Sequence, residues 1–270
     1  MSSLCAFSAS FASPRLMVLF LKEAAMRIDA DNMHYRELNA RIREAVAAGE
    51  THLDLVNVNG QRYLGDGIQG AVEMVVHGVP GNDLGAFMDG PTIRVRGNAQ
   101  DAVANTMNAG RILVEGDAGD VLGYGMRGGE LFVRGRVGYR VGIHMKAFRD
   151  KMPVVIVGGT AGDFLSEYMA GGLLIVLGLD RRKGEPLVGE WCATGMHGGA
   201  LYLRGAIEEW RVASKFAAVR PAEDKDLAGI RPHVSAFCEA FGLDEAAIMQ
   251  EEFLKIAPIS HRPYGAKYAA

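Results

Sequence analysis

A repeat of 19 residues between Met74 and Gly135 is the feature that most constrains how this chain can fold. A unit of the form apolar-x-apolar-x-Gly begins at each of four positions, namely Met74, Ile93, Ile112 and Leu131. Two further ladders keep the same step: Met88, Met107, Met126 and Met145, and Leu84, Val103, Leu122 and Val141. A repeat this short that ends in Gly is typical of a solenoid.

The same unit recurs outside this stretch once two insertions are allowed. After a shift of five residues it appears at Val155 and again at Leu174, and after a further shift of eight at Leu201. Upstream it begins at Val56, which gives eight units between Val56 and Gly205.

Each unit alternates apolar and variable residues, which is the period of a β-strand. One short strand cannot bury its own apolar face, but parallel stacking of successive units can. Stacking in register also places Glu115 between Arg96 and Arg134, which is favourable. The closing Gly suits a corner that needs a positive φ.

We therefore predict an all-β fold, a right-handed parallel β-helix of about eight coils of about 19 residues. A propeller blade needs about 40 residues, so this repeat is too short for one. Left-handed coils usually carry a six-residue repeat, and three equivalent hexads are not found within each unit.

Composition agrees with such a fold and limits the partners. Gly makes up 35 of 270 residues, nearly double ordinary usage, and the excess suits the corners. The net charge of -3 gives no reason to expect a nucleic acid or an anionic membrane as partner. Cys5, Cys192 and Cys238 are scattered and form no CxxC pair, which favours a reducing cytoplasm over a disulfide framework or zinc site.

The chain divides into four parts on this interpretation. Residues 1–25 are interpreted as a disordered or over-called leader before a natural start at Met26, with a signal peptide as the alternative. Residues 26–50 form a strand and a helix with Asn32 as N-cap and Gly49 after its end, and the helix plugs the open end of the solenoid. Residues 51–210 form the β-helix.

Residues 211–270 are the fourth part, a helical and extended C-terminal tail. The sequence predicts one helical stretch at about 223–241 with a break near Pro232, and a second at 244–255. The Pro-rich segment 256–264 is expected to lie extended along the solenoid or on a partner.

Several motifs could carry chemistry, and each has a simpler structural interpretation. Residues 65–70 (GDGIQG) match G-x-G-x-x-G, but a strand follows where the dinucleotide fingerprint needs a helix, so corner glycines are favoured. The Met ladder is interpreted as core. His77, His144 and His197 occupy different columns, so they do not converge within one subunit, although a zinc site shared across an oligomer stays open.

No G-x-S-x-G motif or phosphate-binding P-loop occurs, and we assign no catalytic, cofactor-binding or metal-binding residue to this chain. Two charged insertions interrupt the repeat, 146–152 (KAFRDKM) and 179–188 (LDRRKGEPLV). Solenoid insertions often serve recognition, and tolerated surface loops are an equal alternative.

Residues 26–268 resemble the GXGXG domain of glutamate synthase, the C-terminal right-handed β-helix of its large subunit, and most closely the stand-alone form. The resemblance lies in residues 57–62 (NVNGQR), 81–85 (GNDLG), 116–123 (GDAGDVLG), 126–129 (MRGG), 138–142 (GYRVG), 161–163 (AGD), 169–172 (MAGG) and 196–199 (MHGG). The corresponding β-helical component of formylmethanofuran dehydrogenase and of the formyltransferase/hydrolase complex is a more distant relative that shares the GDAG and MxGG coils.

The resemblance implies a non-catalytic structural subunit of a glutamate synthase-type complex in the cytoplasm. Its partners would be an FMN and iron–sulfur synthase subunit and a glutamine amidotransferase subunit, and those cofactors would lie on the synthase partner. Three scattered cysteines cannot hold an iron–sulfur cluster on this chain. The alternatives are the equivalent component of a formylmethanofuran-type complex and an independent enzyme with a metal or nucleotide at the corners.

Overall fold

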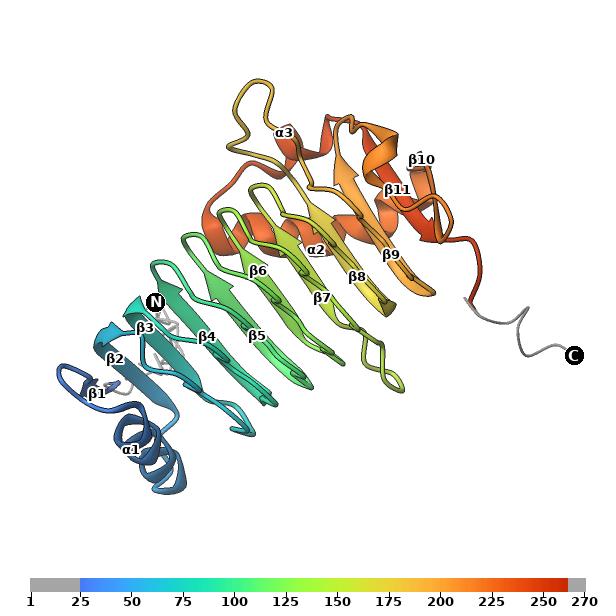
Figure 1. Ribbon diagram of the computed structural model, residues 1–270. Coiled ribbons are helices and arrows are strands. Elements are labelled where there is room, and N and C mark those ends of the chain that lie inside the picture. The colour runs from blue at the N-terminus through green and yellow to red at the C-terminus, as the bar shows by residue number, and fades with distance from the viewer. Residues whose placement is uncertain (1–24, 262–270) are drawn as a thin grey trace, which may run out of the picture.

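The computed structural model describes residues 25–261, and the N-terminal leader proposed at 1–25 therefore lies almost wholly outside the described residues. The described chain forms one sheet of eleven strands in the order β1-β2-β3-β4-β5-β6-β7-β8-β9-β11-β10 (Figure 1). Strands β1 to β9 pair in parallel and in chain order, so the chain winds as a parallel β-solenoid.

The predicted strand units are all present. The parallel strands are β1 (Met26–Asp29), β2 (His52–Asn59), β3 (Glu73–Val79), β4 (Asp89–Arg96), β5 (Ala109–Val114), β6 (Glu130–Val133), β7 (Val154–Val157), β8 (Ala170–Val176) and β9 (Gly198–Arg204). The regular part, from β3 to β9, makes about six rounds. This is slightly fewer than the eight coils predicted.

The register matches the 19-residue ladder. Ile93 lies opposite Ile112, and Ile112 lies opposite Leu131. The Met ladder from Met88 to Met145 and the ladder from Leu84 to Val141 are fully buried inside the solenoid. The structural interpretation of the Met ladder is confirmed, since these side chains belong to one continuous apolar core.

The helix α1 (Tyr35–Ala47) connects β1 to β2 and closes the N-terminal end of the core, as predicted. Leu38, Ile42 and Ala45 are buried in that core. The prediction of Asn32 as N-cap is wrong, because Asn32 has a left-handed φ of 53° in the preceding turn. His34 takes the position instead, with an extended backbone and a ring nitrogen that accepts a hydrogen bond from the Arg36 N–H.

The C-terminal part differs from the prediction in two places. The helix α2 (Asp224–Phe241) runs through Pro232 without a break. Pro232 and Ala228 are both exposed, so water can bond the Ala228 carbonyl that lacks an N–H partner. The second helix, α3, covers only Glu245–Met249, and residues from Phe253 onward form a strand.

That strand, β11 (Phe253–Pro258), pairs antiparallel with β9 and with β10 (Ala217–Pro221). Phe253 and Ile256 are buried there. The backbone groups at the edge of β9 pair with β11, and they would lack this partner if residues 253–258 formed a helix. A short 3₁₀ helix, η1 (Glu209–Arg211), lies between β9 and β10. The extended conformation predicted from residue 256 is present up to Pro258, and residues 262–270 lie outside the described part.

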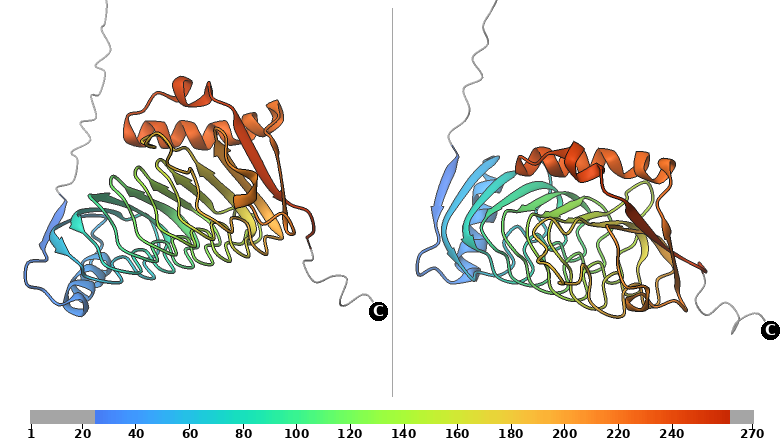
Figure 2. Two further views of the ribbon diagram at one scale, coloured as in Figure 1. Left: turned by 45° about the horizontal axis from the view of Figure 1, so that its top comes forward. Right: turned by 90° about the horizontal axis from the view of Figure 1, so that it is seen from above.

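The helix α2 lies across the outer face of the C-terminal half of the sheet and forms a second apolar core there (Figures 1 and 2). Its Phe237 is fully buried and meets the ring of Phe132 edge-on at 5.7 Å. The outward residues of the strands, among them Leu113, Ile156 and Ile175, join the same cluster. The outer face is therefore covered at one end and bare at the other.

Candidate docking surface

The corners of the solenoid have a repeated backbone conformation. In the coil with sequence VLGYGM, Val121, Gly123 and Gly125 all have a positive φ, between 57° and 65°. The equivalent alternating positions of six other coils, from Tyr63 to Gly195, also have positive φ. This explains the Gly-x-Gly pattern, since Gly adopts this conformation without the steric cost of a side chain.

The G-x-G-x-x-G stretch at 65–70 belongs to these corners. Gly65 and Gly67 take the second and third positive-φ positions of the first such corner, and Gly70 also has a positive φ. The strand β3 begins at Glu73, so no helix follows the last Gly. The corner interpretation is confirmed, and the dinucleotide interpretation loses the helix N-terminus that it requires.

The GDAGD signature at 116–120 has a second, separate cause. Asn98 and Asp101 accept hydrogen bonds one coil further on, from the backbone N–H groups of Asp117 at 2.9 Å and Asp120 at 3.0 Å. A Cβ at Gly116 or Gly119 would overlap the oxygen that accepts each bond. One coil later, Asp117 and Asp120 cap Arg136 and Tyr139 in the same way. Each of these Asn or Asp side chains thus requires a Gly in the next coil. The GDAGD residues therefore stabilise the fold.

The three histidines lie apart, as their columns predicted. His77 bonds Asp54 at 2.7 Å, His197 lies 3.0 Å from the Gly195 carbonyl, and His144 stacks on Tyr168 with ring centroids 5.3 Å apart. Within residues 25–261, no group of three or more His, Cys, Asp or Glu side chains could hold a metal ion.

The outward register prediction around Glu115 is correct only in part. Glu115 pairs with Arg96 on the neighbouring strand, as expected, and also with Arg94 at 2.9 Å. Arg134 instead pairs with Asp180 of the second insertion at 2.7 Å. Asp180 of the second insertion is therefore the ion-pair partner of Arg134, which the repeat alone would place beside Glu115.

Aromatic side chains lie on the corners of successive coils, and we call this set the aromatic corner and define it as Tyr124, His144, Tyr168 and Trp191. His144 lies between Tyr124, at 5.8 Å and edge-on, and the stacked Tyr168. Tyr168 is 36% exposed and Trp191 is 57% exposed. Exposed aromatic rings that lie close together are typical of binding surfaces.

The first insertion, 146–152, forms a small hairpin at this edge of the solenoid. Phe148 and Lys151 exchange two backbone hydrogen bonds of 3.0 Å, and the Lys151 ammonium pairs with Asp89 at 3.1 Å. Phe148 and Met152 are both 49% exposed. The hairpin is thus held by its own backbone and one ion pair while it presents two apolar side chains to solvent.

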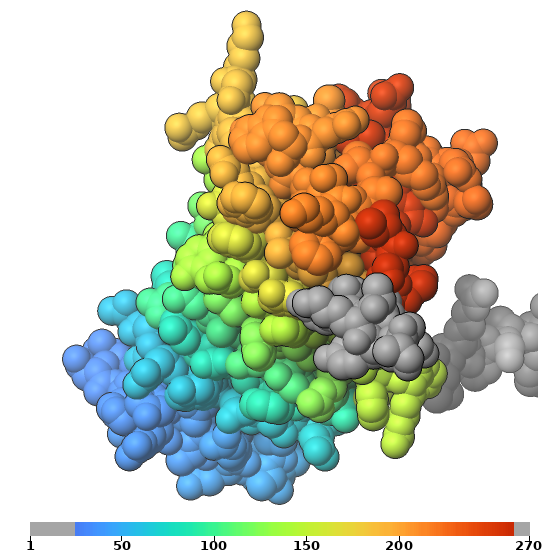
Figure 3. Space-filling model, turned by 45° about the vertical axis from the view of Figure 1, so that its right-hand side comes forward, coloured from blue at the N-terminus to red at the C-terminus, as the bar shows by residue number. Residues whose placement is uncertain are grey.

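The second insertion, 179–188, projects from the opposite side of the molecule, and Figure 3 shows both insertions standing out from the body. Glu185 anchors it by an ion pair with Arg136 at 3.0 Å and by accepting the Arg182 N–H at 2.9 Å. Arg181, Arg182 and Lys183 remain exposed at its tip. This gives the insertion a fixed base and a cationic tip.

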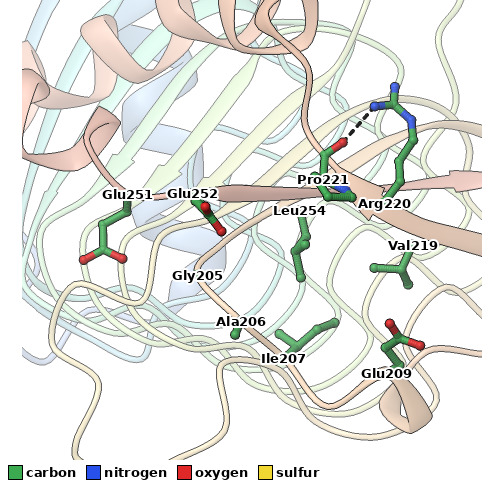
Figure 4. A pocket seen from close by; sticks show the side chains of 10 residues that line it. All are labelled: Gly205, Ala206, Ile207, Glu209, Val219, Arg220, Pro221, Glu251, Glu252 and Leu254. Carbon is green, nitrogen blue, oxygen red and sulfur yellow. Dashed lines mark hydrogen bonds between the residues drawn. The ribbon is translucent and has the colours of Figure 1, made fainter.

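Several pockets lie near the C-terminal end of the solenoid, and one of them is lined by the second insertion. The first, of about 500 Å³, contains Ile207, Val219 and Leu254 with Glu251 and Arg220 at its rim (Figure 4). The Arg220 guanidinium there donates to the Pro221 carbonyl at 2.9 Å and is not aimed into the cavity as a free group.

The second pocket, of about 450 Å³, is more apolar and continues the aromatic corner. Trp191, Trp210 and Phe216 line it together with Lys215. Trp210 is 63% exposed, and the Arg211 guanidinium lies 4.4 Å from the centre of its ring. Sequence reasoning missed this pair because the second insertion and the end of the repeat disturb the spacing between the two tryptophans, although both stand out as the only Trp residues of the chain.

Ion pairs fix the C-terminal cap beside these pockets. Asp226, at the start of α2, is buried and receives 2.7 Å bonds from both Lys255 and Arg220. Burial alone would raise the pKa of Asp226, but the hydrogen bonds from Lys255, the Glu223 N–H and Arg220 outweigh it and hold the pKa well below its usual range. Burial raises the pKa of the free Cys192 thiol to about 12.

These features define a class of protein, a parallel β-solenoid with glycine corners whose exposed aromatic and charged groups lie on its corners and insertions. The family model described as the GXGXG motif matches residues 35–259, and the chain belongs to this family. No helix among residues 25–261 combines the length and the apolar character needed to cross a membrane.

The chain is similar to an uncharacterized protein of Methanocaldococcus jannaschii, with 47% identity over 249 residues that cover 89% of this chain and 95% of the relative. Its fold is similar to a chain in the crystal structure of the formyltransferase/hydrolase complex of Methylorubrum extorquens in complex with methylofuran. That match has a TM-score of 0.58 and 20% identity, and it covers 85% of this chain and 89% of the other.

Proposed function

We propose that this protein is a non-catalytic scaffold subunit of a multi-subunit enzyme complex and that it works in the cytoplasm. The observation that carries the proposal is the aromatic corner, with Trp210 and the exposed Phe148 beside it. Exposed aromatic side chains next to charged groups fit the centre and rim of a protein interface. The first insertion borders this surface and adds the exposed side chains of Phe148 and Met152 to it.

The first candidate complex is of the glutamate synthase type, which converts glutamine and 2-oxoglutarate to glutamate. The chain would hold an FMN and iron–sulfur synthase subunit and a glutamine amidotransferase subunit. Membership of the GXGXG family supports this proposal, since the glutamate synthase domain is what the coil motifs resemble.

The second candidate is a formyltransferase/hydrolase or formylmethanofuran dehydrogenase type of complex, and it has at least equal support. The likeness in fold to a chain of a solved formyltransferase/hydrolase complex covers most of both chains. In this case the same surface would face the other proteins of a one-carbon transfer enzyme.

An affinity purification from the native cell distinguishes the two candidates. The tag belongs after Ala270, because Met26 begins β1 and a tag there would disturb an edge strand. Co-purification of a flavin-containing synthase and an amidotransferase would support the first candidate, and co-purification of formyl-transfer proteins would support the second. A protein recovered alone from the cell would contradict the scaffold role.

Variants then locate the interface. Trp191→Ala combined with Phe148→Ser should abolish co-purification, because it removes two large exposed side chains from the proposed surface. Lys225→Ala is the matched control, since Lys225 is exposed on α2, away from the aromatic corner. If the double variant and the Lys225→Ala control recover equal amounts of partner, the interface lies elsewhere.

A further inference from the structure

The two ends of the sheet differ in how their edges are protected. At the C-terminal end, the edge strand β10 finishes in Pro221, which lacks an N–H, and its Arg220 is bound to Asp226. At the N-terminal end, β1 (Met26–Asp29) contains no proline and pairs with β2 alone among residues 25–261. Although β1 is short and carries two charges, the backbone groups along its outer edge form a template for another strand.

The backbone of β1 fixes which groups are free. The Ala30 N–H bonds the Val56 carbonyl at 2.9 Å, so Ala30 directs its backbone groups to β2. In a parallel ladder alternate residues point to the same side, so Ile28 also faces β2 and the backbone groups of Arg27 and Asp29 face outward.

This arrangement suits an antiparallel pair between two identical strands. A two-fold axis at Ile28 places Arg27 of one copy opposite Asp29 of the other, and the reverse. Residues 27 and 29 then exchange both backbone hydrogen bonds, as a hydrogen-bonded antiparallel pair requires. The side chains of Arg27 and Asp29 are both exposed on the outer face of β1, so opposite charges meet twice.

The surface beside β1 is compatible with this contact. A pocket of about 440 Å³ lies between β1 and α1, with Met26, Ile28, Ala45 and Ala48 as apolar lining. Met26 is 40% exposed at its edge. Charges of both signs, such as Arg41 and Glu44, also line this pocket. A second copy that approaches it therefore does not meet a surface of one charge only.

We propose that the protein forms a two-fold symmetric dimer through the free edge of β1, with an antiparallel strand pair centred on Ile28 that joins two sheets into one. The occupant is a second copy because only a strand with opposite charges on either side of its centre complements itself in this register. The dimer is independent of the scaffold role, since β1 lies at the opposite end of the solenoid from β8 and β9 (Figure 1), and Trp191 and Trp210 lie in the segments that follow these two strands.

A charge exchange tests the register with the full-length protein. Arg27→Asp places Asp opposite Asp, and Asp29→Arg places Arg opposite Arg, so each single variant should dimerise about tenfold to hundredfold more weakly than the wild type. An equimolar mixture of the two variants restores both attractive pairs, and a heterodimer should form. The double variant, Arg27→Asp with Asp29→Arg, should dimerise like the wild type.

Analytical ultracentrifugation over a concentration series measures the dissociation constants, and thermal unfolding shows that each variant is folded. The double variant also controls for the hydrogen bonds that Asp29 accepts from Asn57 and the Asp31 N–H, because it loses them as well. A monomeric wild type would overturn the proposal. Dissociation constants that do not change in the single variants, or a mixture that fails to form heterodimers, would equally overturn it.

Discussion

The pairing of an acidic residue with a glycine one coil above it makes a quantitative prediction. Asp101 Oδ1 accepts the Asp120 N–H at 3.0 Å, and the space that a Cβ of residue 119 would need is occupied by this carboxylate. The two nearest atoms to that Cβ belong to the Asp101 side chain, the third is the Asp101 backbone nitrogen at 3.3 Å, and no positive φ is involved. Replacing Gly119 therefore tests mainly the steric fit against the Asp101 side chain.

We expect Gly119→Ala to destabilise the fold by about 1–3 kcal/mol, the usual cost of overpacking. Asp101→Ala should cost about 1–2 kcal/mol, because a partly buried N–H loses its acceptor. In the double variant the new methyl group enters space that the carboxylate has left. The double variant should therefore be more stable than the sum of the single losses by about 1–2 kcal/mol.

Urea unfolding of the four proteins, followed by circular dichroism, measures this coupling. For a chain of this size about 1 kcal/mol corresponds to a melting temperature shift of about 2–4 °C, so thermal scans give a second readout. Gly229→Ala is the control, because Gly229 lies in α2 with no atom near its Cβ position. It should be neutral or stabilising by about 0.5–1 kcal/mol. Additive losses for Gly119 and Asp101 would refute the reasoning.

Four further outcomes follow from buried groups. Ser166→Ala should raise stability by about 1 kcal/mol in urea unfolding, because the hydroxyl is buried and has no hydrogen-bond partner among the described residues. Phe237→Ala should lower it by about 3–5 kcal/mol, since it empties the centre of the second core. The pKa of Asp226 in the folded protein is depressed below the ordinary 3.8, so the stability that ionised Asp226 contributes is present above pH 3.8 and is lost as the pH falls further. Asp226→Asn should therefore flatten the acid limb of a plot of unfolding free energy against pH. Cys192, with its pKa raised to about 12 by burial, should react with a thiol reagent only at the rate of unfolding, and rapid labelling in the native state would contradict its burial.

The inner half of the fold was predictable because its cause is periodic. Each core position recurs after 19 residues, so Met88 and Met107 identify one another without any structure. The capping helix was predictable from its own apolar face. Its N-cap was not, because Asn32 and His34 can both accept such a hydrogen bond, and the choice depends on a turn conformation that the sequence does not display.

The C-terminal cap was harder to predict because its order depends on distant partners. Residues 244–255 have helical spacing, but Phe253 and Ile256 bury themselves against β9 instead. A signal for the second core was nevertheless present. The outward position of successive strands changes from Val75 and Arg94 to Phe132 and Ile156, and such apolar outward residues require a cover.

The same change along the sheet bears on where a partner can dock. Over the C-terminal half, α2 already occupies the outer face, and Phe132 is fully buried beneath it. Over the N-terminal half, the outer face is bare but polar, with His77 paired to Asp54 and Arg96 paired to Glu115. Neither part of the sheet face offers the exposed apolar centre that a stable interface needs. The aromatic corner and the first insertion do expose large apolar side chains, and this is why we assign docking to them.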